Sequence, residues 1–122
     1  MLILIAHGSR DGRWRASVEC VVEALQDELG RDAVRLAYME HTPPTLMDLA
    51  TEAAGAGLKT IRVLPLFLAE EGHVERDIVP LVEAARDAWS ALDVQLLEPM
   101  GQHPEFLEAL GRIAGRVAKE EP

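Results

Sequence analysis

The sequence from residue 64 to residue 77 reads LPLFLAEEGHVERD. Its first five residues are apolar, a pattern typical of a short strand that is buried on both faces. Two glutamates, a glycine and His73 follow. Asp77 is a residue type that often caps a helix, so the next helix is expected to begin there. The stretch therefore predicts a buried strand that places a histidine just beyond its carboxyl end.

A second stretch repeats this plan near the start of the chain. Residues 3–11 read ILIAHGSRD, in which an apolar strand is followed by His7, a glycine and residues that favour a helix start. Ser9 or Asp11 is a suitable cap for that helix. The two stretches together predict that His7 and His73 lie at one edge of one sheet.

Short apolar runs and helical stripes alternate along the whole chain. Strands are predicted at residues 1–6, 33–40, 60–68 and 93–98. Helices are predicted from apolar side chains spaced three or four residues apart at residues 14–29, 46–54, 78–89 and 106–117. Four successive strand–helix units favour an α/β fold with parallel strands, right-handed crossovers and helices on both faces. A length of 122 residues suits one domain, 1–122.

Composition excludes several classes of protein. The net charge of -9 argues against a nucleic-acid partner, because nucleic acids select basic surfaces. No basic leader precedes the first apolar run, and no apolar run reaches the roughly 20 residues of a membrane span. A lone cysteine, Cys20, excludes an internal disulfide and is expected to be a small core or interface residue. These features predict a cytoplasmic protein with no membrane partner.

Polar side chains that are suited to ligand binding or catalysis follow each of the predicted strands. Ligands of open parallel sheets bind beyond the carboxyl ends of the strands, so these residues are the candidates for a site. They are His7 after the first strand, Glu40 and His41 after the second, Glu70, Glu71 and His73 after the third, and Gln102 and His103 after the fourth. Imidazole and carboxylate groups suit either a divalent transition metal or general acid–base catalysis.

Other interpretations stay open for the same residues. A phosphohistidine nucleophile at His7 is disfavoured, because Ala6 stands where an arginine is expected for that chemistry. Glu40 is equally suited to cap the helix that follows it. His41 and His103 lie beside proline turns, which favours a structural or merely exposed role. No P-loop or dinucleotide-binding glycine motif supports a nucleotide.

Several motifs resemble those of the class II tetrapyrrole chelatases, most closely the short CbiX-type sirohydrochlorin cobaltochelatases. The motifs are HGSRD at 7–11, AYME at 37–40, PLFL at 65–68, GHVERDI at 72–78 and PMGQHP at 99–104. The resemblance covers nearly the whole chain. It implies a chelatase-like three-layer sandwich, in which helices flank a four-stranded parallel sheet of order 2-1-3-4.

The resemblance also implies an activity and its substrates. Members of this family insert a divalent metal into sirohydrochlorin without ATP and without an organic cofactor. Co²⁺ is the expected metal, with Ni²⁺ or Fe²⁺ as alternatives that the same ligands accept. Short members pair as homodimers. A carrier that binds the metal or the tetrapyrrole without turnover is the alternative function.

Site roles follow from the same resemblance. His7 and His73 are expected to hold the metal and to help deprotonate the pyrroles, with Glu40 as the third catalytic residue. Ser9, Arg10 and Arg76 are expected to bind the tetrapyrrole, whose eight carboxylates suit arginine partners. One departure is the segment Ala69-Glu-Glu-Gly72, where family members often carry a glycine-rich turn. Glu70 and Glu71 are therefore where metal preference is expected to differ.

Overall fold

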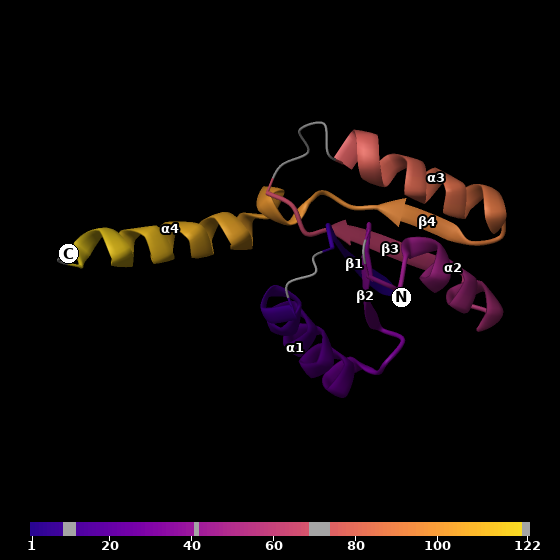
Figure 1. Ribbon diagram of the computed structural model, residues 1–122, viewed down its shortest axis with the longest axis horizontal. Helices are drawn as coiled ribbons and strands as arrows, with labels where there is room; N and C mark the ends of the chain where they lie inside the picture. The colour runs from indigo at the N-terminus through magenta and orange to yellow at the C-terminus, as the bar shows by residue number, and fades with distance from the viewer. Residues whose placement is uncertain (9–11, 41, 69–73, 121–122) are drawn as a thin grey trace.

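Four parallel strands form the centre of the computed structural model, which describes residues 1–8, 12–40, 42–68 and 74–120. The strands are β1 (Leu2–Ala6), β2 (Val34–Tyr38), β3 (Thr60–Pro65) and β4 (Asp93–Leu96). Their order in the sheet is β2-β1-β3-β4, and every neighbouring pair is parallel. This confirms the predicted sheet order (Figure 1).

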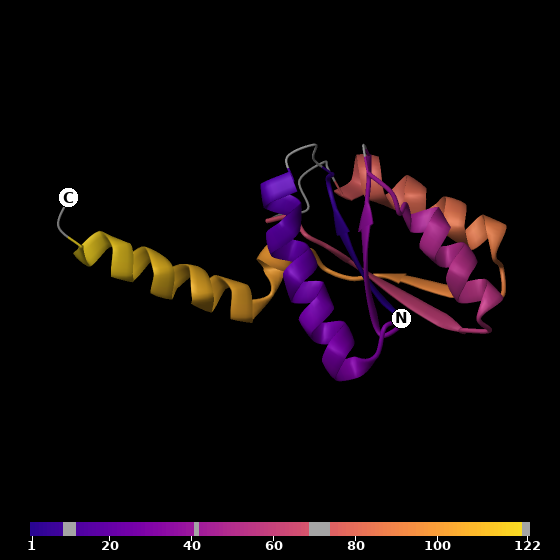
Figure 2. The ribbon, with the colours of Figure 1, turned by 60° about the horizontal axis from the view of Figure 1, so that its bottom comes forward.

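Helices follow each strand and cover the two faces of the sheet unequally. They are α1 (Gly12–Leu29), α2 (Leu46–Gly55), α3 (Val79–Ala88) and α4 (Pro104–Lys119). A π-helical turn, η1 (Val74–Ile78), precedes α3, and a 3-10 turn, η2 (Met100–Gln102), precedes α4. Helices α2 and α3 lie on one face and α1 on the other, whereas α4 projects away from the sheet (Figures 1 and 2). The alternation of strand and helix was therefore predicted, but not the course of the last helix.

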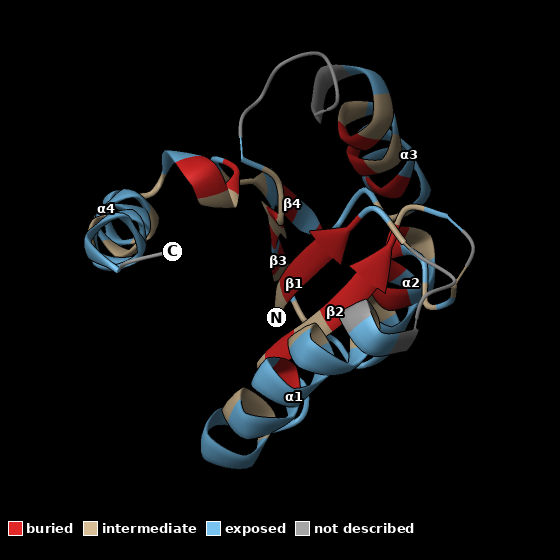
Figure 3. Cartoon of the chain, turned by 60° about the vertical axis from the view of Figure 1, so that its left-hand side comes forward, coloured by how far each residue is buried: buried red, intermediate tan, exposed pale blue. Residues whose placement is uncertain are grey.

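Two apolar clusters, one on each face, account for the core. Side chains alternate along β1, so Ile3 and Ile5 point to the α2–α3 face while Leu4 and Ala6 point to the α1 face. The first cluster is the larger and includes Leu46, Leu49, Ala53, Ile61, Val63, Ile78, Val82 and Val94. The second comprises Leu4, Ala6, Val22, Val34, Leu36 and Tyr38. Figure 3 shows the buried strands between the helices.

The start of α2 has a capping box, whereas the start of α3 lacks the cap predicted for it. Thr45 forms a capping box with Asp48, in which each side chain accepts a hydrogen bond from the other residue's backbone N–H. The prediction that Asp77 caps the third helix is wrong, because Asp77 lies inside η1 and α3 begins at Val79. The π-helical turn keeps Ile78 fully buried in the core.

The structure also tests the predictions for Cys20, for the end of the third strand and for membrane spans. Cys20 is exposed, so it is not a core residue. Strand β3 ends at Pro65 and not at residue 68 as predicted, because proline has no N–H for the ladder. Among the described residues, no helix is long and apolar enough to cross a membrane.

Candidate metal site

His7 and Glu40 come together at the carboxyl ends of β1 and β2. Backbone hydrogen bonds extend the pairing of these strands, from Met39 N–H to Ala6 O at 2.9 Å and from Glu40 N–H to His7 O at 3.2 Å. The side chains meet, with His7 Nδ1 lying 3.3 Å from Glu40 Oε1. Two residues predicted from separate strand ends are therefore direct neighbours.

Gly8 is the reason that the two backbones can approach so closely. It has a φ of +101°, a conformation that favours glycine. A Cβ atom at this position would lie 2.0 Å from the Glu40 carbonyl oxygen. Any larger residue would push the loop after β1 away from the loop after β2, and the His7–Glu40 pair would separate.

The surroundings of the His7 ring favour one tautomer. Nδ1 faces two acceptors, Glu40 Oε1 at 3.3 Å and the Gly8 carbonyl oxygen at 3.4 Å. A neutral imidazole that carries its proton on Nδ1 satisfies both contacts and leaves the Nε2 lone pair unprotonated. A carboxylate that orients the distal nitrogen of a metal-binding histidine is a common arrangement in metal sites. His7 and Glu40 are about half exposed, at 52% and 49%, so an ion can reach them.

The pair opens into a cavity of about 280 Å³ that η1 helps to line. Its walls are His7, Met39, Glu40, Arg76, Asp77 and Leu81. Arg76 was predicted to bind substrate, and the structure places it in the same cavity as His7 and Glu40. Asp77, which was predicted to cap a helix, adds a second carboxylate to this cavity.

Three predicted site residues lie outside the described residues. They are Ser9 and Arg10, which follow Gly8, and His73, which precedes η1. Their positions, and those of Glu70 and Glu71, therefore stay predictions. Within the part of the chain that the structure describes, no three histidine, cysteine, aspartate or glutamate side chains gather into a metal site.

The remaining site candidates have separate outcomes. His103 Nε2 lies 3.0 Å from the Glu98 carbonyl oxygen at the junction between β4 and α4, which favours the structural role expected for it. His41 lies outside the described residues. Thr45, and not Glu40, caps α2, so the capping alternative for Glu40 is wrong.

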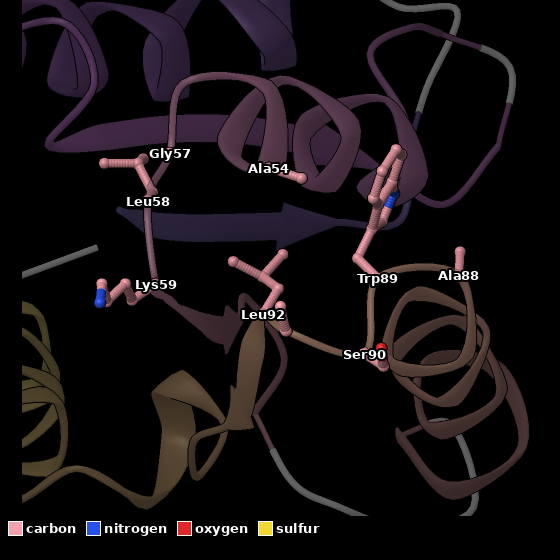
Figure 4. A pocket seen from close by; sticks show the side chains of 9 residues that line it. Ala54, Gly57, Leu58, Lys59, Ala88, Trp89, Ser90 and Leu92 are labelled. Atoms are coloured by element: carbon pink, nitrogen blue, oxygen red, sulfur yellow. The ribbon is translucent and has the colours of Figure 1, made fainter.

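A larger cavity, of about 490 Å³, lies where α2 and α3 end and β3 and β4 begin, at the opposite edge of the sheet. Figure 4 shows Lys59, Trp89 and Leu92 among its lining residues. That lining contains one charged group, the Lys59 ammonium, and no imidazole, thiol or carboxylate. It offers no ligands for a divalent cation, so the smaller cavity at His7 is the candidate site despite its size.

Comparison with known proteins identifies the family of the chain. The CbiX family matches residues 1–116 of the chain. The chain belongs to the CbiX family. A CbiX protein from Marinobacter aquaeolei VT8, solved by crystallography, has a TM-score of 0.83 and 29% identity to this chain, with 98% of both chains covered. The sirohydrochlorin chelatase SirB from Bacillus subtilis subspecies spizizenii, solved in complex with cobalt, shares the fold at a TM-score of 0.79 and 20% identity.

Curated relatives carry chelatase names. The sirohydrochlorin cobaltochelatase of Methanopyrus kandleri is 35% identical over 77 residues, which are 63% of this chain and 54% of the relative. The chloroplastic sirohydrochlorin ferrochelatase of Arabidopsis thaliana is 28% identical over 109 residues, which are 89% of this chain and 48% of the relative. This CbiX-family chain thus spans about half the length of both relatives.

Proposed function

We propose that this protein is a chelatase that inserts Co²⁺ into sirohydrochlorin. The observation that carries the proposal is the His7–Glu40 pair, which lies with Arg76 and Asp77 around one cavity at the carboxyl edge of a CbiX-family sheet. Imidazole and carboxylate ligands suit a first-row divalent metal. The relatives bear cobalt and iron in their names, so Fe²⁺ is one competing metal. Ni²⁺ is another, because it accepts the same ligands.

His7 is the first residue to hold the incoming ion. Its Nε2 lone pair is free for the metal while Glu40 and the Gly8 carbonyl orient Nδ1. A half-exposed imidazole–carboxylate site is open on one side, in contrast to the closed four-ligand sites that retain structural metals. The metal is a substrate of this reaction and must leave the site, so an open site is what the reaction needs.

His73 is the proposed second ligand, because both ends of its loop are anchored beside His7. Leu66 N–H donates to Ile5 O at 2.9 Å, so the chain leaves β3 alongside β1. It returns at η1, where Arg76 and Asp77 line the His7 cavity. His73 is three residues before Arg76, and three extended residues span at most about 11 Å.

Metal insertion releases two protons from the pyrrole nitrogens of the macrocycle. Each nitrogen loses its proton and binds the metal, so the product is the metallated ring and the protons need an acceptor. Glu40 and the two histidines are the bases that we assign to this step. Arg76 stands at the cavity wall, and we assign it, with Ser9 and Arg10, to the carboxylates of the substrate.

A partner subunit is part of the proposal. The His7 cavity, at about 280 Å³, falls below the range of about 300–1,000 Å³ that encloses a drug-sized ligand, and a tetrapyrrole is larger still. A tetrapyrrole therefore needs a second wall to its binding site, and we assign that wall to the partner subunit of a cytoplasmic homodimer. Longer structures such as SirB from Bacillus subtilis contain the matched fold in 47% of their chain.

Turnover is the experiment that separates the enzyme from its alternative, a carrier. Purified protein is mixed with a large molar excess of sirohydrochlorin and Co²⁺, and the absorption spectrum of the metallated product is followed. The proposal predicts many equivalents of product per protein chain, above the rate without protein. Formation of one equivalent or less, together with tight Co²⁺ binding, would show a carrier. Parallel assays with Ni²⁺ and Fe²⁺ identify the preferred metal.

A further inference from the structure

Arg15 of α1 has a guanidinium group that lacks a partner in the described part of the chain. Its Nε atom is buried and has no hydrogen-bond acceptor among the described residues. Within the same part of the chain the guanidinium forms no ion pair. Burial of a charged donor without an acceptor is unfavourable, because the group loses hydration and gains no hydrogen bond. Such a group needs an explanation, and binding of an anionic ligand provides one.

The acidic neighbour of Arg15 is already engaged with another residue. Glu19 lies one helical turn after Arg15, the spacing at which opposite charges on a helix normally pair. Glu19 Oε1 instead accepts a hydrogen bond from the Tyr38 hydroxyl at 2.9 Å. Arg15 is close enough to act on the same hydroxyl, since burial and Glu19 raise the pKa of Tyr38 whereas the charge of Arg15 lowers it. The hydrogen bond from Tyr38 therefore keeps the Glu19 carboxylate from pairing with the guanidinium.

Arg15 lies near the edge of the sheet that carries the candidate metal site. Tyr38 is the last residue of β2 and pairs with Ala6, which directly precedes His7. Helix α1 begins at that same edge, as Figure 2 shows, and Arg15 belongs to its first turn. Side chains of a helix lean toward its first turn, so a long side chain at this position extends toward the strand ends.

The position of Arg15 is also unfavourable for the helix itself. The first turn of a helix carries the positive end of the helix dipole, so acidic side chains are favoured there and basic ones are not. The first turn of α1 contains Arg13 and Arg15 and no acidic residue. Residues that break a local rule of this kind are typical of functional sites, where another gain offsets the cost. A bound anion offsets this repulsion.

We propose that Arg15 binds a peripheral carboxylate of the tetrapyrrole, and that the Tyr38–Glu19 hydrogen bond keeps Arg15 available for it. The carboxylates of the substrate lie around its rim, whereas the nitrogens that take the metal lie at its centre, next to His7. Arg76 lines the His7 cavity from η1, which leads into α3, so the two arginines approach the macrocycle from the two faces of the sheet. Guanidinium and carboxylate groups form strong, often paired hydrogen bonds. This inference rests on the proposed function, because it assigns a further residue to the same substrate.

The first test measures the binding of metal-free sirohydrochlorin to the full chain, with no Co²⁺ present. Arg15→Gln should raise the Kd at least about 10-fold, the usual consequence of losing one charged hydrogen bond. Arg31→Gln is the matched control, because Arg31 lies in the exposed turn beyond the other end of α1, and it should bind like wild type. Circular dichroism checks that each variant is folded. Equal Kd values for wild type and Arg15→Gln would overturn the inference.

The methyl ester of sirohydrochlorin gives a second readout. It has the same macrocycle but no ionised carboxylate, so wild type and Arg15→Gln should bind it with the same Kd. A loss that persists with the ester would show that Arg15 acts through the fold and not on a carboxylate, and would overturn the proposal.

Tyr38→Phe tests the positioning role of the tyrosine hydroxyl. Without this hydroxyl Glu19 can pair with Arg15, so the Kd for sirohydrochlorin should rise about as much as in Arg15→Gln. Tyr38→Phe/Glu19→Gln should restore wild-type binding, because no carboxylate is left on α1 to compete for the guanidinium. A merely structural role of Tyr38 predicts no such rescue, and a double variant that binds as weakly as Tyr38→Phe would show that the positioning role is wrong.

Turnover distinguishes a failure of this inference from a failure of the proposed function. In the cobalt assay, Arg15→Gln should raise the KM for sirohydrochlorin and leave kcat close to wild type, since His7 still holds the metal. If wild type inserts cobalt and Arg15→Gln has an unchanged KM, the role of Arg15 is wrong and the chelatase proposal stands. If wild type binds sirohydrochlorin through Arg15 but inserts no cobalt, the chelatase proposal fails and the role of Arg15 stands.

Discussion

At the scale of single residues, Gly8 lets the two strand ends that carry His7 and Glu40 approach each other closely. Its φ of +101° and its contact with the Glu40 carbonyl bring the loops after β1 and β2 into register. Gly30 offers a matched comparison, because its φ of +104° is nearly the same and nothing lies within 4 Å of a Cβ placed there. The two positions separate the effect of backbone conformation from the effect of crowding.

Gly8→Ala is therefore expected to cost more than Gly30→Ala. Positive φ alone should lower the free energy of unfolding by about 1–2 kcal/mol in both variants. The clash with Glu40 should add about 1–3 kcal/mol at Gly8 and displace His7 from Glu40. Urea unfolding measures the loss of stability in each variant, and the rate of cobalt insertion reports the displacement of His7. Equal stability and equal activity in the two variants would contradict this role of Gly8.

Residue chemistry also explains which parts of the site could be predicted. His7 and Glu40 follow buried strands directly, so the rule on carboxyl ends identified them without a structure. Their pairing depends on strand order, which came from the family resemblance. Asp77 was missed, because an aspartate before an apolar run has the same signature whether it caps a helix or lies in a π-helical turn. The structure reveals the π-helical turn that holds Asp77, and such turns are frequent at functional sites.

At the scale of elements, side-chain hydrogen bonds join α1 to β2, and one of them involves Tyr38. The Tyr38 hydroxyl donates to Glu19 Oε1 at 2.9 Å. Burial, and then the hydrogen bond to Glu19, raise the pKa of Tyr38 to about 12 from its ordinary value of 10.0. Because the pKa is higher in the folded protein than in the unfolded chain, folding favours the neutral phenol.

The stability of the protein should therefore fall at alkaline pH in a way that depends on Tyr38. Its contribution is complete below pH 10, where the phenol is neutral in both states, and is lost as pH rises toward about 12. The free energy of unfolding, measured at steps across this window, should fall more steeply for wild type than for Tyr38→Phe. Tyr38 is the only tyrosine in the sequence, so tyrosinate absorbance reports its titration directly. Parallel curves for the two proteins would contradict the shift.

Elements were predictable where local sequence and tertiary packing agree. Strands were predicted at residues 1–6 and 60–68, and the structure has β1 at Leu2–Ala6 and β3 at Thr60–Pro65. Helix α4 was predicted from its apolar stripe, but periodicity does not reveal which surface a stripe covers. The exit of α4 is set by the contact of Gly101 with Leu68, two residues far apart in the sequence.

At the scale of the whole molecule, the cavities at the two opposite ends of the sheet differ in the chemistry of their lining. The carboxyl ends of β1 and β2, together with η1, gather imidazole, carboxylate and guanidinium groups around one cavity. The opposite edge has a larger but mostly apolar cavity that offers no metal ligands. Strand alternation predicted the gathering of polar residues at the carboxyl edge, because parallel strands place all their carboxyl ends there. It did not predict the cavity at the opposite edge.

The most direct test of the central claim is the initial rate of Co²⁺ insertion into sirohydrochlorin by His7→Ala. His103→Gln is the matched control, because His103 is a structural histidine at the start of α4 and glutamine can still donate to the Glu98 carbonyl. If the His7 edge performs the reaction, His7→Ala loses at least about 100-fold in rate while His103→Gln stays close to wild type. A wild-type rate in folded His7→Ala would contradict the account.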